Sequence, residues 1–201
     1  MTTSRSSVTL GFVFVVATLV TAGCGNATTS TTSPGPASNA TAAEVNSAGD
    51  IPDNQVYVPF APTNGLFTVA VPEGWSRSDI GAATVFTDKS NSMRVDTIAR
   101  SSAPTVDSAK ADELPGVESS TVGYIPGSVS VVERSTGRAV LATYQAASAV
   151  DPVTGKTVTE AVERYEFWRD GHEVILTLAG PMGADNVDPW RTVTDSLRWL
   201  Q

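Results

Sequence analysis

The sequence predicts an α+β fold in which a few helices pack on one antiparallel β-sheet of about six strands. Residues 128–180 alternate apolar and polar side chains in successive segments separated by turn sequences, which is typical of a long C-terminal meander. Two other segments, 105–116 and 188–200, carry helix-capping residues or helical spacing. The roughly 150 residues from Ile51 onward show no internal repeat and have the size of one ordinary domain.

The first half of this domain contains three predicted strands. The first covers residues 67–71, where the apolar side chains at 67, 69 and 71 share one face, and it ends at a Pro-Glu-Gly-Trp turn. The next two strands cover residues 83–88 and 92–99, with a Lys-Ser-Asn turn at 89–91 between them.

The second half supplies the meander. Residues 128–150, 157–170 and 171–180 are rich in β-branched and aromatic residues, which favour strands. The Asp170-Gly171 pair suits a two-residue type I′ hairpin, and residues 152–155 suit a longer loop. We therefore expect these strands to follow one another as antiparallel neighbours.

A short helix is predicted over residues 105–116. Thr105 or Asp107 can cap its N-terminus, and Pro115-Gly116 is expected to end it. A helix of this length is marginal alone, so packing against the sheet must support it.

A second helix is predicted to close the chain. Asp188-Pro189 suits the N-cap and first helical position. Apolar side chains then recur at spacings of three, four and three, at Trp190, Val193, Leu197 and Leu200. This spacing gives one apolar stripe that can lie across the sheet.

The N-terminus indicates export and attachment to a membrane. Arg5 precedes an apolar run over residues 8–20, and small residues then lead to Cys24, the one cysteine in 201 residues. Ala22-Gly23-Cys24 resembles the lipobox of bacterial lipoproteins, with Thr21 where leucine is commonest. The resemblance implies cleavage before Cys24 and acylation of its thiol. An ordinary secreted protein with a stray thiol and an uncleaved anchor helix are the alternatives.

These features divide the chain into three parts. Residues 1–23 are predicted to be a lipoprotein signal peptide, and residues 24–50 a lipidated cysteine followed by a disordered Ser/Thr/Ala/Pro tether. Residues 51–201 are predicted to form the globular domain on the extracytoplasmic face of the cell membrane. The covalent lipid anchor would be the membrane contact, since two or three acyl chains hold a protein durably.

Charge excludes one class of partner. The chain has a formal net charge of −8, with 13 basic and 21 acidic residues. Nucleic-acid binding and electrostatic docking on an anionic membrane surface both need basic patches. We therefore expect no nucleic-acid partner.

A family resemblance adds to this interpretation. The Phe-Thr-Val-Ala-Val-Pro-Glu-Gly-Trp segment at 67–75, the meander and the Pro-Trp-Arg-Thr-Val-Thr-Asp-Ser-Leu segment at 189–197 resemble the PsbP-like fold, in particular LpqN-type lipoproteins of mycobacteria and related actinobacteria. The resemblance covers residues 67–200. It implies a PsbP-like sandwich without enzymatic activity, in some members an accessory to envelope lipid or glycolipid trafficking. No ligand-binding residue or cofactor carries over from the family.

Candidate catalytic groups are few. His172 is the one histidine and follows the predicted Asp170-Gly171 turn, without a nucleophile elbow elsewhere in the sequence. A zinc site would lack the N and S ligands that this metal prefers. Glu160, Glu163 and Glu166 cluster beside arginines, which is more typical of a solvated face than of a carboxylate active site. An envelope hydrolase that uses these carboxylates or His172 is the alternative function.

The aromatic residues suggest a binding surface. Successive strand residues face opposite sides of a sheet, so Phe167 and Trp168 cannot lie under the same helix. If the second face is bare, Trp168 with Tyr144 or Tyr165 would form an exposed aromatic patch. The sequence therefore favours a non-catalytic binding or accessory module for an envelope lipid, a glycolipid or an envelope protein. A purely structural scaffold is a further alternative.

Overall fold

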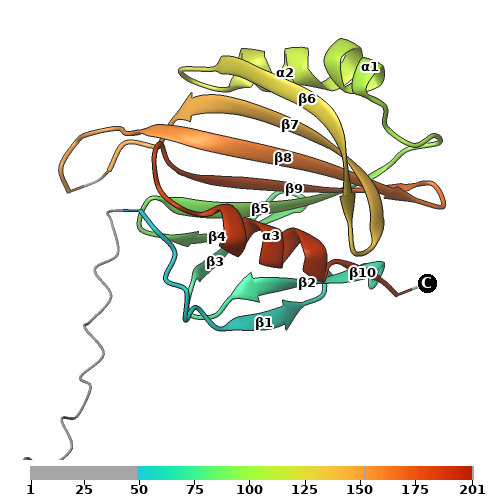
Figure 1. The fold of residues 1–201 in the computed structure, drawn as a ribbon, viewed down its shortest axis with the longest axis horizontal. Helices are drawn as coiled ribbons and strands as arrows, with labels where there is room; N and C mark the ends of the chain where they lie inside the picture. Colours follow the sequence, from blue (N-terminus) through green and yellow to red (C-terminus); the bar gives the residue numbers. More distant parts are fainter. Residues whose placement is uncertain (1–48, 152, 201) are drawn as a thin grey trace, which may run out of the picture. The chain divides into compact units, whose positions relative to one another are not determined.

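The structure of the protein is a computed structural model that describes residues 49–151 and 153–200. The described residues form antiparallel sheets with short helices, which confirms the predicted α+β class (Figure 1). Ten strands are present in this part of the chain, where about six were expected. The predicted signal peptide, Cys24 and nearly all of the predicted tether lie outside the described residues. No helix in the described ranges is both long and apolar enough to cross a membrane.

A seven-stranded antiparallel sheet forms the framework, in the order β3-β4-β5-β9-β8-β7-β6. The meander is present as expected, and β5 pairs with β9 to join it to the first half of the domain. The strands are β3 (Ser76–Ile80), β4 (Ala83–Asp88), β5 (Asn91–Ala99), β6 (Ile125–Arg134), β7 (Gly137–Ala147), β8 (Thr159–Arg169) and β9 (His172–Pro181). The β8–β9 turn has positive φ at both Asp170 (49°) and Gly171 (86°), as a type I′ turn requires.

A three-stranded sheet packs below the large one. Its strands are β1 (Tyr57–Phe60), β2 (Phe67–Pro72) and β10 (Arg198–Trp199), with β2 in the middle. Neither β1, β3 nor β10 was predicted. β1 contains a proline, every residue of β3 is exposed and β10 has two residues, so none has the apolar alternation that reveals a strand.

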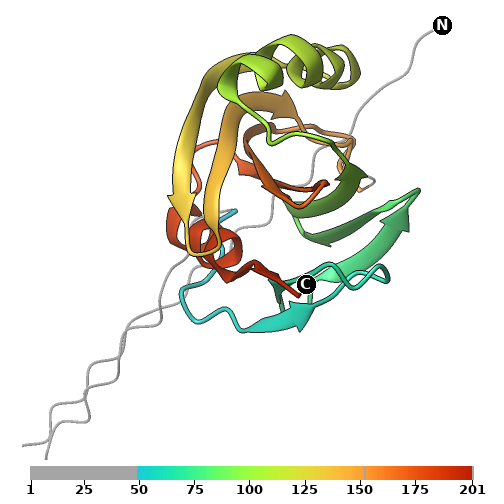
Figure 2. The same cartoon turned by 90° about the vertical axis from the view of Figure 1, so that its right-hand side faces the viewer.

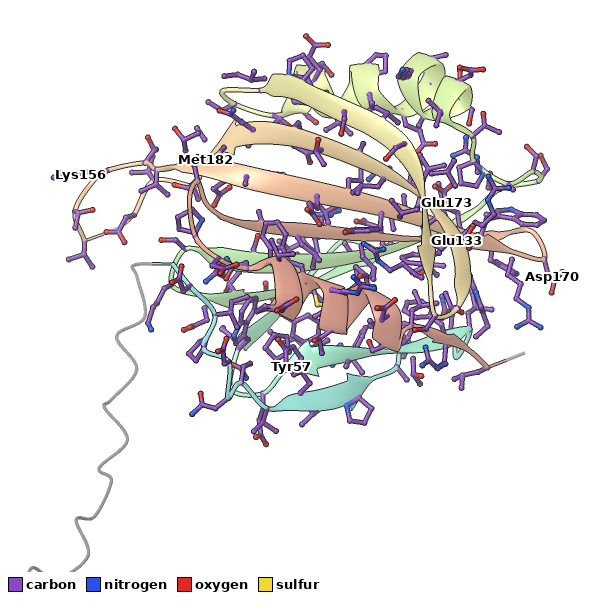
Figure 3. The ribbon with its side chains drawn as sticks, in the orientation of Figure 1. Tyr57, Glu133, Lys156, Asp170, Glu173 and Met182 are labelled. Atoms are coloured by element: carbon purple, nitrogen blue, oxygen red, sulfur yellow. The ribbon has the colours of Figure 1, made fainter. Side chains whose placement is uncertain are left out.

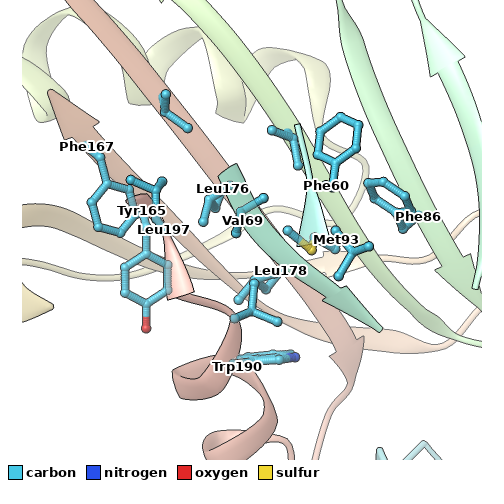
Figure 4. Packing of buried hydrophobic residues seen from close by; sticks show 14 of the residues in the cluster. Phe60, Val69, Phe86, Met93, Tyr165, Phe167, Leu176, Leu178, Trp190 and Leu197 are labelled. Carbon is cyan, nitrogen blue, oxygen red and sulfur yellow. The ribbon is translucent and has the colours of Figure 1, made fainter. Parts of the chain in front are cut away.

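The main core lies between the two sheets and beneath α3 (Val187–Ser196) (Figure 4). Its largest side chains come from both sheets, from α3 and from the residue that follows α3: Phe60, Phe67, Phe86, Met93, Tyr165, Phe167, Leu176, Leu178, Trp190 and Leu197. Burial of this apolar surface is the main force that holds α3 and the small sheet on the large one.

The predicted start and end of α3 need correction. The residue before the helix is Asn186, not Asp188, and Pro189 lies inside the first turn. Asn186 cannot cap the helix because its side chain accepts from Ile51 N and donates to Asn91 Oδ1 instead. The helix ends at Ser196, and the chain then turns into β10. Leu200 is therefore 53% exposed and is not part of the buried stripe.

The other face of the large sheet is covered by residues 105–120, which we call the helical cover. It consists of α1 (Val106–Ser108), a π-helical turn η1 (Ala109–Glu113) and α2 (Leu114–Ser120). Figures 1 and 2 both show the large sheet between this cover and the small sheet. The second face is therefore not bare near its centre.

The helical cover begins where the sequence predicts and ends later. Thr105 caps it through a capping box with Ser108. Pro115 does not end the helix, contrary to expectation. The preceding π-helical turn places it in the first positions of α2, where a missing N–H costs no intrahelical bond.

Candidate functional site

The predicted aromatic site residues lie on different faces of the large sheet. Tyr165 packs in the main core beneath α3 and is 2% exposed. Trp168 points to the opposite face, where its Nε1 donates to the Arg100 carbonyl at 2.8 Å. Residues three apart on a strand have opposite orientations, so Tyr165 does not share a surface with Trp168. This corrects the expectation that Tyr165 could join Trp168, whereas Phe167 and Trp168 do face opposite sides.

Tyr144 shares a face with Trp168 but lies far along the sheet. It pairs with Val162, and six strand residues separate that position from Trp168, or about 20 Å. The Tyr144 ring contacts Tyr124 with centroids 5.1 Å apart, within a small apolar cluster under α2. The two predicted residues therefore belong to separate environments.

Trp168 borders a cleft of about 910 Å³. The cleft opens where the tip of the β6–β7 hairpin, residues 135–138, diverges from the end of β8. Residues 103–106 and 198–199 form its other walls. In Figure 3, Glu133 of β6 and Asp170 of the β8–β9 turn mark this end of the sheet, opposite Lys156.

The cleft combines aromatic surface with positive charge. Trp168 and Trp199 line it, together with three arginines and, among the described lining residues, one acidic residue: Arg138, Arg169, Arg198 and Glu166. Arg198 Nη1 donates to two backbone carbonyls near the end of α3. The other two arginines contact exposed carboxylates at 3.6 and 3.3 Å. Exposed ion pairs are weak, so the Arg138 and Arg169 guanidinium groups can exchange these carboxylates for an added anion.

The wall formed by the β6–β7 hairpin is tied to the rest of the domain. Arg134 donates to Thr194 Oγ1 of α3 and to the Tyr165 hydroxyl, each at 2.9 Å. The Ser135 N–H donates to Asp195 Oδ1 at 3.0 Å. Tyr165 therefore positions a cleft wall from within the core.

A buried charge cluster lies behind the cleft. It contains Glu113 of the helical cover, Glu166 of β8 and Glu173 of β9, with Arg100 and Arg164 between them. Arg164 donates to Glu113 at 2.8 Å and to Glu166 at 3.1 Å, and Arg100 donates to Glu173 at 2.8 Å and also to Glu113. The expectation that Glu166 lies on a solvated charged face is wrong, because this residue is 1% exposed. Glu173 beside it is 0% exposed.

Burial and hydrogen bonding together give the three carboxyl groups different pKa values. Desolvation, then a hydrogen bond with Glu113, raises the pKa of Glu166 to about 8. Desolvation also raises the pKa of Glu173, although Arg100 opposes the shift. Desolvation would raise the pKa of Glu113 as well, but its hydrogen bonds with Glu166, Arg100 and Arg164 outweigh that effect and lower it.

The cluster could be read as a metal site, because ligand atoms of its three glutamates lie within 4.8 Å of one another. However, Arg100 and Arg164 already bind both oxygens of Glu113 and one oxygen each of Glu166 and Glu173. Two adjacent guanidinium groups oppose a further cation, and Ca²⁺ needs six to eight oxygen ligands. The donor set fits a proton better than a metal ion.

The carboxylates proposed for the alternative hydrolase do not converge. Glu163 faces the α3 side of β8 and accepts from the Tyr165 hydroxyl at 2.6 Å. Glu160 and Glu166 share the other face but are about 20 Å apart along the strand. His172 begins β9 at the hairpin and pairs in register with Arg169. An arrangement of nucleophile, base and orienting acid is therefore not assembled from these residues.

No family model and no curated protein matches the sequence. Among solved structures, the solution structure of cyanobacterial PsbP (CyanoP) from Synechocystis sp. PCC 6803 superposes with a TM-score of 0.53 at 11% identity, over 75% of this chain and 98% of that one. The fold is PsbP-like. This likeness shows the fold alone.

Two further solved structures superpose less closely on this chain. LpqN, described as involved in cell envelope biogenesis of Mycobacterium tuberculosis, has a TM-score of 0.36 at 15% identity, over 73% of this chain and 92% of that one. A Bacteroides thetaiotaomicron VPI-5482 protein has a TM-score of 0.47 at 12% identity over 71% of this chain. The match spans 48% of that protein, about half its length.

The cleft could not be located from the sequence, because neither the predicted strands nor the spacing of motifs brings its lining residues together. Strand parity identifies Trp168, but the sequence predicts a helix over Trp199, which lies three residues beyond the end of α3. The arginines of the cleft come from β7, β8 and β10, and their meeting depends on how the PsbP-like sheet curls.

Proposed function

We propose that this PsbP-like domain is a non-catalytic binding module of the cell envelope that takes an anionic lipid or glycolipid in the Trp168 cleft. The single observation that supports it is the lining of that cleft, with two indole rings and three arginines in a chain of net charge −8. A positively charged cleft in a protein of net negative charge favours a negatively charged ligand.

The chemistry of the walls indicates where each part of such a ligand binds. The Trp168 and Trp199 rings offer flat apolar surface for an acyl chain or a sugar face. Arg198, Arg138 and Arg169 offer forked donors for a phosphate or carboxylate headgroup. A cleft of about 910 Å³ lies within the range of small-molecule sites and would hold a headgroup with part of one chain.

The proposed location follows from the N-terminus. We propose that Cys24 carries the lipid anchor and that the tether presents the cleft close to the outer surface of the membrane. Replacement of the thiol by Cys24→Ala should leave an unprocessed precursor and abolish incorporation of labelled fatty acid, which radiolabelling and detergent-phase partitioning measure. A variant that still incorporates palmitate would contradict the anchor.

A binding experiment tests the cleft. The full chain in phosphatidylcholine nanodiscs is titrated with hexyl phosphate, which is short enough to stay in water, and tryptophan emission is followed. Because charge-assisted hydrogen bonds contribute about 1.5–3 kcal/mol, Arg198→Gln should weaken binding about tenfold or more. Trp199→Ala should weaken binding too. Arg77→Gln is the matched control, since Arg77 is exposed on β3 and pairs with Asp79, and neither residue lines the cleft.

The outcomes separate the candidate functions. Saturable binding that depends on Arg198 but not on Arg77, with the probe recovered unchanged, supports the proposal. Hydrolysis of ester, phosphoester or glycoside substrates that is lost on Glu160→Gln, Glu163→Gln or His172→Ala would instead support the hydrolase. Equal binding by wild type and Arg198→Gln would contradict a headgroup site in this cleft.

A further inference from the structure

The buried charge cluster carries an unbalanced charge when every group is ionised. Three carboxylates face two guanidinium groups, which leaves one negative charge in a region where Glu166 and Glu173 are inaccessible to solvent. An uncompensated buried charge is strongly unfavourable, and such groups usually take up a proton instead.

Two carboxyl oxygen atoms in the cluster lack a hydrogen-bond donor among the described residues. Glu166 Oε2 and Glu173 Oε1 are buried and have no hydrogen-bond partner within the described part of the chain. Carboxyl oxygens of Glu113 and Glu166 lie within 4.8 Å of each other, and a hydrogen bond between the two groups contributes to the pKa shift of each. A carboxylate cannot donate one, whereas a protonated Glu166 can. One proton therefore removes the excess charge and supplies the missing donor.

We propose that the cluster binds one proton between Glu166 and Glu113, and that this proton fastens the helical cover to the sheet, so that the cover closes more tightly as pH falls and loosens as pH rises. Glu113 is the one cluster residue that belongs to the cover. The ion pairs that connect the cover to β8 and β9 therefore run through Glu113 and this cluster.

The groups around the proton come from each element that meets there. Glu113 and the Ser108 hydroxyl approach from the cover, Arg164 from β8 and Glu173 from β9. Arg100, which follows β5, binds Glu113, Glu173 and Ser108 together. Arg164 and Arg100 keep Glu113 ionised, so the proton resides chiefly on Glu166.

The direction of the pH effect follows from linkage. The folded-state pKa of Glu166, about 8, lies above the ordinary value of 4.5, and that of Glu173 is shifted in the same direction. A raised pKa means that the closed state holds a proton which the open state releases above its ordinary pKa. The closed cover is therefore favoured in acid, loses that advantage progressively up to about pH 8 and changes little beyond it.

The cover also borders the ligand cleft. Residues 103–106 precede and begin the cover and line the cleft, as do Glu166 and Trp168. A looser cover would reshape that wall. This consequence rests on the proposed function, whereas the proton-fastened cover does not.

The experiment measures the cover without any ligand. Amide hydrogen exchange of residues 106–120 is followed in the full chain, in phosphatidylcholine nanodiscs, at pH 5.5, 7 and 8.5, with rates corrected for intrinsic exchange. Because each pH unit within the window changes the opening equilibrium about tenfold, protection should fall at least tenfold from pH 5.5 to 8.5. Glu166→Gln keeps a donor at this position without titrating, so its protection should depend on pH much less than that of wild type. Glu118→Gln, on the exposed face of α2, should follow wild type.

A second measurement keeps the proposal testable if Glu166→Gln does not fold. Carbon-13 NMR of glutamate side-chain carboxyl groups in the wild-type chain should show one glutamate that titrates well above pH 6. Protection that is independent of pH in wild type, or carboxyl groups that all titrate below pH 6, would overturn the proposal. Restoration of full protection at pH 8.5 by added Ca²⁺ or Zn²⁺ would also overturn it in favour of a metal site. Protection that falls with pH as expected, in a protein that does not bind hexyl phosphate, would contradict the ligand cleft and still support the proton-fastened cover.

Discussion

Trp190→Ala should lower the free energy of unfolding by about 3–5 kcal/mol, the usual loss when a buried tryptophan is truncated. The indole is 8% exposed and belongs to the main core beneath α3. It also lies over the Gly180 backbone, where an added Cβ would approach the ring to 3.5 Å. Equilibrium urea unfolding measures the loss.

Leu200→Ala is the matched control for this prediction. Leu200 falls on the same sequence stripe as Trp190, but its side chain lies beyond the helix and is exposed. Its truncation should change stability by less than about 1 kcal/mol. A small effect at Trp190 would mean that α3 presents this ring to a partner and not to the core.

Arg164→Leu should cost about 3–5 kcal/mol at pH 7, because it leaves carboxylates buried without their counter-ion. Arg164 donates to Glu113 and Glu166 and is itself largely buried. Protonated carboxyl groups need no counter-ion, so the deficit should shrink as pH falls from 8 to 5. Urea unfolding at several pH values measures both effects.

Arg138→Leu, which breaks an exposed ion pair, is the control for Arg164→Leu. Arg138 and Glu133 are both exposed and 3.6 Å apart, so solvent screens their attraction. The change in stability should stay within about 1 kcal/mol and be nearly independent of pH. A deficit at Arg164 that is no larger than this would contradict a buried, charge-balanced cluster.

The sequence predicts the elements whose residues interact locally. The strands of the meander follow from alternation, the β8–β9 turn from Asp170-Gly171, and the start of the helical cover from Thr105. Strand parity placed Phe167 and Trp168 on opposite faces. The same parity places Tyr165 with Phe167, so its exclusion from the Trp168 surface could have been predicted.

The charge cluster could not be predicted, because its members are separated in the chain. Glu166 and Arg164 share a strand face, which the sequence shows. Arg100 and Glu173 reach them only through the pairing of β8, β9 and β5, and Glu113 only through the helical cover. A glutamate beside an arginine has the same sequence pattern on a solvated face as in a buried cluster. The π-helical turn that brings Glu113 to the sheet has no recognised sequence signal here.

One measurement tests the binding cleft most directly. The full chain in nanodiscs is incubated with a photoreactive alkyl phosphate, irradiated, and analysed by mass spectrometry for the crosslinked residues and for the chemical state of the unbound probe. We expect crosslinks at residues 103–106, 135–139, 166–169 and 198–199, competition by hexyl phosphate and an intact probe. Crosslinks gathered around Tyr144 and Tyr124, or conversion of the probe to products, would contradict a non-catalytic site at Trp168.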